Sequence, residues 1–272
     1  MLCVVVLLFL VYRRRKSLGK SFQSYPRLGS GEMFDHIADY YDGMNRLISL
    51  GLDMSWRRSA VRHLTSLPLH STILDVAMGT GDLSLALLQR RPDYHIVGID
   101  PSLAMLRRAE HKLKYSNIVQ GVAEGLPFAD GTFSAVMVAF GVRNFEDRKK
   151  GILEMRRVMR DDGTMVIIEL GYPDDKNGKW CLRWISVLAK LFIGYIVPCL
   201  GSCLVRSGEE YHYLQQSMYS FPDAATFQHF LQTECELCWI HYERCFLGVG
   251  PHIYVLRKQL SRFDGIKLRS SG

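Results

Sequence analysis

The 272-residue sequence lacks an N-terminal apolar run long enough to span a membrane. Residues 1–12 are apolar, but a spanning helix needs about 20 such residues. Basic residues follow this run at 13–16, whereas a secretory signal peptide carries them in front of it. Three interpretations stay open for residues 1–30: a membrane-associating segment, an organelle-targeting leader, or a start codon assigned too far upstream. We therefore place residues 1–30 outside the predicted fold.

Acidic residues are scarce at both ends of the chain. The net charge is +7, and much of the excess lies before Glu32 and in the C-terminal region, including a basic tail at 259–272. Such charge can attract nucleic acid or anionic lipid. The middle of the chain is close to neutral, which argues against a nucleic-acid partner.

The seven cysteines lack the spacing of a disulfide framework, which indicates a reducing compartment. Cys235 and Cys238 form a C-x-x-C pair, but no second pair follows. We interpret both as buried thiols and expect no metal site.

Internal repeats are also missing, and the middle of the chain alternates between strand-like and helix-like patterns. The predicted strands are 73–77, 95–100, 117–123, 133–141 and 164–170, and the predicted helices are 82–91, 102–113 and 149–160. Alternating units of this kind predict an α/β fold with a mostly parallel sheet and helices on both faces. Ligands bind such sheets at the carboxyl ends of the strands.

The loop after the first strand, in ILDVAMGTGDLSLAL (73–87), lacks the third glycine of a dinucleotide-binding fingerprint, because Ser84 occupies that position. Asp75 in the strand and Asp82 in the first helical turn bring negative charge to a helix N-terminus that would otherwise attract a pyrophosphate. The loop therefore favours a ligand with positive charge and no phosphate. S-adenosylmethionine carries an ammonium and a sulfonium and fits this description.

Asp100 ends the second predicted strand, where a carboxylate can accept both hydroxyls of a ribose. Its alternative role is the N-cap of the next helix, but Ser102 is the better cap. Val122 and Ala123 follow the third strand, where the adenine edge should lie. Leu126 offers an apolar wall there.

Several longer stretches resemble the ubiquinone/menaquinone C-methyltransferase family, and in detail the demethylmenaquinone methyltransferases. They are MFDHIADYYDGMNRLISLGLDMSWRR (33–58), LDVAMGTGDL (74–83), AEGLPFADGTFSAV (123–136), FGVRNFEDRKKGILEMRRVMRDDG (140–163), YHYLQQSMYSFP (211–222) and GVGPHIYVLRK (248–258). The resemblance covers most of residues 33–258 in the family's order.

The resemblance implies a Rossmann-like class I S-adenosylmethionine-dependent methyltransferase fold over residues 31–258, with a seven-stranded sheet and a helical lid at about 176–220. The implied cofactor-binding residues are Asp75, Gly79, Thr80, Gly81, Asp100, Val122, Ala123 and Ala139. The chain departs from the family at Val122, where Asp or Asn is usual, and at Ala139, where some members have Ser. Met78 replaces a smaller residue in the cofactor loop.

The implied reaction transfers a methyl group to a ring carbon of a prenylated quinol. Demethylmenaquinol is the favoured substrate, and the ubiquinone precursor, or both, remain open. Arg143 and Asn144 are the implied catalytic residues, with Arg143 stabilising a phenolate or orienting a water. The alternative is that Arg143 ties down a loop by pairing with Glu146 or Asp147. The predicted quinol-pocket residues are Tyr40, Tyr211, Tyr213 and His252, and His252 is the alternative general base.

The apolar segment 179–204 is interrupted by Lys190 and Pro198. We interpret it as a lid that receives the prenyl tail or rests on the bilayer surface. We therefore expect a cytoplasmic protein attached peripherally to the inner membrane face, with a homodimer left open. Two rivals remain: an inert quinone-binding relative, and a nucleic-acid methyltransferase, whose Asn/Asp-Pro-Pro-aromatic motif is replaced here by ELGYPDD (169–175).

Overall fold

The computed structural model describes residues 31–114, 117–170, 213, 216–217, 220–245 and 250–258. The predicted leader, Tyr211, the basic tail and nearly all of the predicted lid lie outside these residues. Among the described helices, none has the length and apolarity needed to cross a bilayer.

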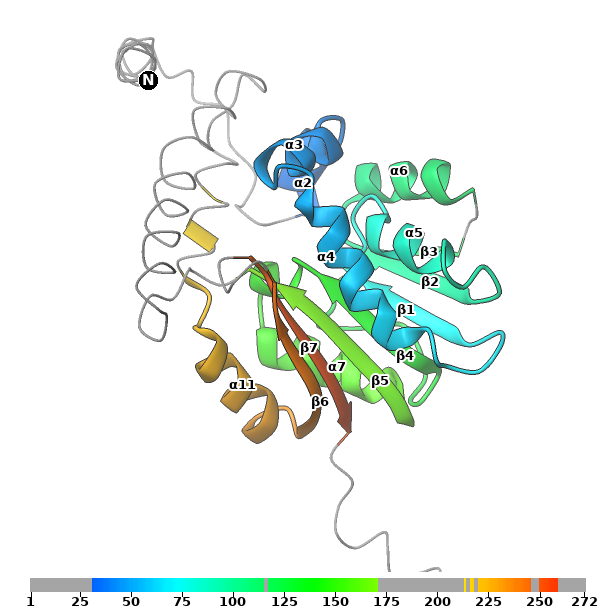
Figure 1. Ribbon diagram of the computed structural model, residues 1–272. Coiled ribbons are helices and arrows are strands. Elements are labelled where there is room, and N and C mark those ends of the chain that lie inside the picture. Colours follow the sequence, from blue (N-terminus) through cyan, green and yellow to red (C-terminus); the bar gives the residue numbers. More distant parts are fainter. Residues whose placement is uncertain are drawn as a thin grey trace, which may run out of the picture.

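The centre of the molecule is a seven-stranded sheet with the order β3-β2-β1-β4-β5-β7-β6 (Figure 1). Its strands are β1 (Thr72–Val76), β2 (His95–Asp100), β3 (Ile118–Gln120), β4 (Phe133–Ala139), β5 (Met159–Glu169), β6 (Leu237–Arg244) and β7 (His252–Lys258). β1 to β5 pair in parallel, and β7 runs antiparallel to both β5 and β6. The predicted seven-stranded, mostly parallel sheet is confirmed.

Helices cover both faces of the sheet because the central strands are apolar on both sides. Ile73 of β1 packs with α4 (Leu52–Val61) and α5 (Asp82–Leu88), whereas the next residue, Leu74, packs with α7 (Arg148–Val158) and α11 (Ala224–Thr233). Figure 1 shows α4 crossing the near side of the sheet and α7 behind it. This alternation is the period of two expected of a strand buried on both faces.

Three further helices border the carboxyl ends of the parallel strands. α6 (Leu103–Leu113) follows β2, while α2 (Gly31–Ile37) and α3 (Tyr41–Ile48) precede the sheet in sequence. Figure 1 shows α2 and α3, in blue, beyond the end of the sheet where the parallel strands finish. The N-terminal helices therefore cover the edge at which ligands of such folds bind.

Several predicted boundaries are wrong, including those of the strand predicted at 164–170, which begins at Met159, and of the helix predicted at 82–91, which ends at Leu88. The predicted helix 149–160 ends at Val158, and Met159 is already extended and paired with Phe133 in the sheet. Met159 is fully buried, so the apolar contact overrides the helical pattern. The predicted strand 117–123 is short, because only Ile118–Gln120 pair with β2 and the chain then turns into the edge of a cavity.

Candidate active site

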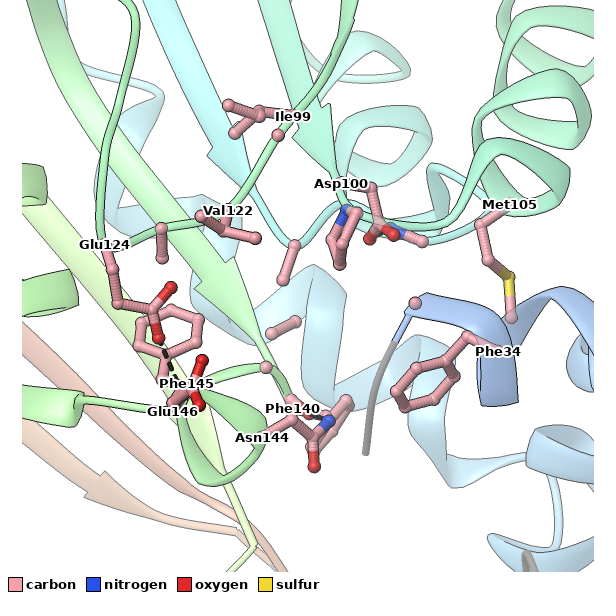
Figure 2. A pocket seen from close by; sticks show the side chains of 18 of the residues that line it. Phe34, Ile99, Asp100, Met105, Val122, Glu124, Phe140, Asn144, Phe145 and Glu146 are labelled. Atoms are coloured by element: carbon pink, nitrogen blue, oxygen red, sulfur yellow. Dashed lines mark hydrogen bonds between the residues drawn. The ribbon is translucent and has the colours of Figure 1, made fainter. Parts of the chain in front are cut away.

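A cavity of about 190 Å³ lies at the carboxyl ends of the first four strands. Its walls come from the ends of β1 (Ala77, Gly79), β2 (Ile99, Asp100), β3 (Gly121–Glu124) and β4 (Ala139–Gly141), with Phe34 and Tyr41 from the N-terminal helices. Figure 2 shows Phe34 and Met105 on one side of this cavity and Glu124 and Phe145 on the other. We call it the cofactor cavity.

Asp100 is the buried carboxylate of the cofactor cavity. Its Oδ2 accepts a hydrogen bond from the Gly79 N–H at 2.8 Å, and its Oδ1 accepts one from the Ser102 N–H at 2.9 Å. Burial raises the pKa of Asp100 to about 6, against the effect of these two hydrogen bonds. Ser102 is the N-cap of α6, as expected. Each Asp100 oxygen keeps a lone pair, so the carboxylate can still accept hydrogen bonds from a diol.

The glycine loop turns sharply beside Asp100. Gly79 and Gly81 have φ values of +57° and +82°, which favour glycine because no Cβ is present. A Cβ built on Gly79 would meet only the Tyr41 ring, at 3.9 Å. The Gly79 backbone therefore faces open space in the cavity and lets a ligand approach closely.

Gly81 and the side chains of two other predicted cofactor-binding residues do not line the cavity. Asp75 is buried in β1, where its Oδ2 accepts a hydrogen bond from Ser84 Oγ at 2.6 Å. Burial raises the pKa of Asp75 to about 7. Thr80 turns away and donates from Oγ1 to Asp42 Oδ1 at 2.6 Å. Both side chains support the loop instead of facing the ligand.

Asp82 does not present a free charge to the cavity, so the prediction that its charge selects the ligand is wrong. Its carboxylate pairs with Arg46 at 2.9 Å and with Lys112 at 2.7 Å, and Arg57 lies 3.9 Å away. Burial opposes ionisation, but the bonds from Lys112 and Arg46 hold the pKa of Asp82 below its ordinary value. This ion-pair cluster ties α3 to α5 and α6.

The predicted adenine edge does line the cavity. Val122 is 49% exposed there, while Ala123 is buried and Ala139 lies at the end of β4. Sequence reasoning missed Glu124, whose Oε1 accepts hydrogen bonds from the Glu146 and Asp147 N–H groups at 2.6 and 3.2 Å. Nothing local marks Glu124, because its partners follow β4.

A second, smaller cavity of about 60 Å³ adjoins the cofactor cavity and shares Phe34, Tyr41 and Asn144 with it. We call it the inner cavity. Its other lining residues are Met33, Ile37, Met44, Asn45, Ile48, Arg143, Tyr213 and Ser217. Tyr213 donates from its hydroxyl to Asn144 Oδ1 at 2.8 Å. The structure thus brings the predicted residues Arg143, Asn144 and Tyr213 together.

Arg143 is held by Glu169, a residue that sequence reasoning missed. Glu169 ends β5, is fully buried, and forms an ion pair with the Arg143 guanidinium. Its Oε2 also accepts the Arg143 backbone N–H at 3.1 Å. Asp147, a partner considered from the sequence, instead caps α7 by accepting the Lys150 N–H. Glu169, at the carboxyl end of β5, therefore fixes the position of Arg143.

Two other predicted quinol-pocket residues lie outside both cavities. Tyr40 is 55% exposed, and its neighbour Tyr41 lines both cavities instead. His252 Nδ1 shares a 2.6 Å hydrogen bond with the Tyr242 hydroxyl on β6. Tyr40 lies in the turn before α3, which leaves its side chain exposed, and His252 is held in the pairing of β7 with β6.

The cysteine pair also differs from expectation. Cys235 is buried, and burial raises the pKa of its thiol to about 12, whereas Cys238 is exposed. The prediction of two buried thiols is therefore wrong for Cys238.

The residues of the cofactor cavity suit S-adenosylmethionine. Asp100 would hold the ribose hydroxyls, the open backbone at Gly79 would admit the amino-acid portion, and apolar Ile99 and Val122 would contact the adenine. None of these groups requires a phosphate. The carboxylates that line the cavity, Asp100, Glu124 and Glu146, agree with a nucleoside that carries positive charge.

Comparisons with known proteins agree with this geometry. The ubiE/COQ5 methyltransferase family matches residues 25–254. A demethylmenaquinone methyltransferase from Thermotoga maritima is 37% identical over 189 residues, covering 70% of this chain and 80% of the relative. A ubiquinone/menaquinone biosynthesis C-methyltransferase UbiE from Geotalea uraniireducens is 37% identical over 204 residues, covering 72% and 83%.

A solved structure shows the same fold. It is an S-adenosyl-L-methionine-dependent methyltransferase from Methanococcus maripaludis, with a TM-score of 0.56 and 18% identity. The match covers 90% of this chain and 100% of that chain.

Proposed function

Because the chain belongs to the ubiE/COQ5 methyltransferase family, we propose that it converts demethylmenaquinol to menaquinol. The family membership makes it an S-adenosylmethionine-dependent methyltransferase of quinone biosynthesis. Relatives named demethylmenaquinone methyltransferase from Thermotoga maritima and Thermus thermophilus, at 37% and 39% identity, support this choice. The relatives named for both quinones keep the ubiquinone precursor as the alternative substrate.

The observation that carries the proposal is the adjacency of the two cavities. Phe34, Tyr41 and Asn144 line both, so a ligand in the cofactor cavity would lie next to one in the inner cavity. The inner cavity combines apolar side chains with the polar groups of Arg143 and Asn144. A quinol ring has the same combination, a flat apolar body with polar oxygens at its edge.

Methylation of a ring carbon requires the adjacent hydroxyl to lose its proton, since a phenolate makes that carbon a better nucleophile. S-adenosylmethionine supplies the electrophilic methyl group. Arg143 and Asn144 hold the quinol oxygen, and the Arg143 charge favours its ionised form. Glu169 takes part of that charge but fixes the guanidinium at the edge of the inner cavity. The sulfur–methyl bond would break as the carbon–carbon bond forms, and the ring proton would then pass to water as the ring regains its aromaticity.

Substrate preference is tested by incubating the purified protein with radiolabelled S-adenosylmethionine and either reduced demethylmenaquinone or the reduced ubiquinone precursor. We expect label in the organic extract with the naphthoquinol. Label with both substrates would make the enzyme dual-purpose. Label with the benzoquinol alone would overturn the proposed substrate, and label with neither, despite cofactor binding, would favour the inert-binder or nucleic-acid alternatives.

The role of Arg143 predicts a specific kinetic loss. Arg143→Ala should lower kcat by about 100-fold or more, the usual cost of removing one group that stabilises developing negative charge. S-adenosylmethionine affinity should stay unchanged, because Arg143 does not line the cofactor cavity.

The matched control is Arg160→Ala, which removes an exposed arginine that pairs with Asp162 near the amino end of β5. It should turn over normally. Unchanged turnover of Arg143→Ala would reject the catalytic role and leave only the structural pairing with Glu169.

The membrane expectation belongs to the same proposal. A prenylated quinol resides in the bilayer, so we propose that the enzyme collects it at the membrane surface.

A further inference from the structure

A cluster of metal-ligating side chains lies outside both cavities. His63 comes from η1 (Arg62–Leu64), at the end of α4, and His241 and Glu243 come from β6. One ligating atom from each of these side chains lies within 4.8 Å of the others. Within the part of the chain that the structure describes, no other three His, Cys, Asp or Glu residues converge in this way.

The distances between the three side chains are close to the distances between the ligands of a bound metal ion. Two ligands about 2.0–2.2 Å from a tetrahedral Zn²⁺ lie roughly 3.4 Å apart. His63 Nε2 lies 4.0 Å from Glu243 Oε2, and the His63 and His241 ring centroids are 4.7 Å apart. His241 is exposed on the edge strand, so a rotation of its side chain can close the remaining gap.

Two features of His63 and Glu243 favour the binding of an ion. His63 Nε2 is buried without a hydrogen-bond partner, a state that costs free energy unless another group satisfies it. Glu243 is oriented by Ser59, whose Oγ lies 2.9 and 3.0 Å from its two carboxylate oxygens. Support of this kind is typical of the residues behind metal ligands.

We propose that His63, His241 and Glu243 bind a divalent first-row transition-metal ion such as Zn²⁺. Imidazole ligands favour such ions over Mg²⁺ and Ca²⁺, which prefer oxygen. The bound ion links η1 to the edge strand β6 and so acts on stability, not on the reaction. This site revises the expectation of no metal, because its ligands meet only in the folded chain.

Several positive charges oppose the ion, because Arg58, Arg90 and Arg244 line the same cavity as Arg62 and Glu243. The Arg62 guanidinium lies 4.0 Å from Glu243 Oε2. Its side chain is 57% exposed, so it can turn into solvent when the ion enters.

The test is a titration of the full-length, untagged, metal-free protein with Co²⁺, followed by absorption, and with Zn²⁺, followed by calorimetry and thermal unfolding. We expect one ion per chain and a rise in Tm. His241→Ala should weaken the affinity at least tenfold and abolish the rise, and Glu243→Gln should do the same. The matched control is His95→Ala, which alters a second histidine pair, His70 and His95, whose rings stack at 6.0 Å.

Three results would overturn the proposal. They are the absence of saturable binding to millimolar Zn²⁺, equal affinity in the His241→Ala variant and the wild type, and thiolate charge-transfer bands in the Co²⁺ spectrum, which would assign the ion to cysteine. Because His241 is exposed, its replacement leaves the core intact and keeps the comparison interpretable.

Discussion

At the scale of single residues, the site depends on carboxylates that are buried for different reasons. Asp100 faces the cofactor cavity, with its two oxygens bonded to backbone N–H groups. Asp75 lies deeper in the sheet, where Ser84 bonds to Oδ2 and Oδ1 has no hydrogen-bond partner. Two carboxylates that look alike in sequence therefore differ in role: Asp100 can meet a ligand, and Asp75 shapes the loop that carries Gly79.

Asp75 makes stability depend on pH. Burial raises its folded pKa to about 7 from an ordinary value of 3.8, so the folded state holds the proton more tightly than the unfolded state. The resulting destabilisation is absent below about pH 4, grows as pH rises, and is complete above pH 7. Asp75→Asn removes it while keeping an acceptor for Ser84. The variant's gain in unfolding free energy should be larger at pH 8 than at pH 5 by about 1–3 kcal/mol.

The measurement is urea unfolding of both proteins, without cofactor, at the two pH values. Ser84→Ala serves as a control, because it removes the hydrogen bond and leaves the buried carboxyl group in place. A gain that does not change with pH would show that Asp75 keeps its proton, or its charge, over the whole range.

At the scale of elements, the cofactor loop fits against β2 because a large side chain of the loop lies over a glycine of the strand. Met78 packs with Leu106 and Ala109 of α6. Gly98 in β2 makes room for it, since a Cβ at Gly98 would lie 1.9 Å from Met78 Sδ. The strand beside the loop therefore accommodates the bulk of Met78.

This contact predicts a paired effect. Gly98→Ala should destabilise the protein by about 1–3 kcal/mol, because added volume in a packed core forces neighbours from their rotamers. Gly98→Ala should cost less when Met78→Ala is already present, so the effects of the two changes should not be additive in denaturant unfolding.

Gly43→Ala in α3 is the matched control. Its Cβ would meet nothing within 4 Å, so the change should raise stability by about 0.5–1 kcal/mol through helix propensity. Additive effects of Gly98→Ala and Met78→Ala would contradict the proposed packing of Met78 against Gly98.

At the scale of the whole molecule, the cofactor cavity lies between the sheet and the N-terminal helices. The strands supply Asp100 and Gly79, and α2 and α3 supply Phe34 and Tyr41. A ligand bound there contacts groups that separate on unfolding, so it should stabilise the complete fold.

S-adenosylmethionine at about 100 times its Kd should therefore raise the unfolding free energy by about 2.7 kcal/mol. Asp100→Asn should reduce that gain at the same ligand concentration, because an amide replaces the buried carboxylate as the acceptor for the ribose hydroxyls. Thermal unfolding with and without ligand measures both values. The proposed role of Asp100 fails if the variant is stabilised as strongly as the wild type.

Local patterns in the sequence determined the order of the elements and the strand ends that form the cavity. Alternating apolar runs predicted the parallel sheet, and the turn at Gly79 and Gly81 marked the ligand loop. Asp100, Val122 and Ala123 followed from their places after predicted strands, since parallel strands end at a common edge. These inferences hold because periodicity and turn chemistry act over a few residues.

Only the tertiary structure decided which side chains meet. It paired Arg143 with Glu169, enclosed Asp82 between Arg46 and Lys112, and placed His63 beside β6. These partners come from different elements, and neither spacing nor periodicity records which of many available charges will lie within bonding distance. A buried charge must find a partner wherever packing brings one, so pairing is settled by the whole fold.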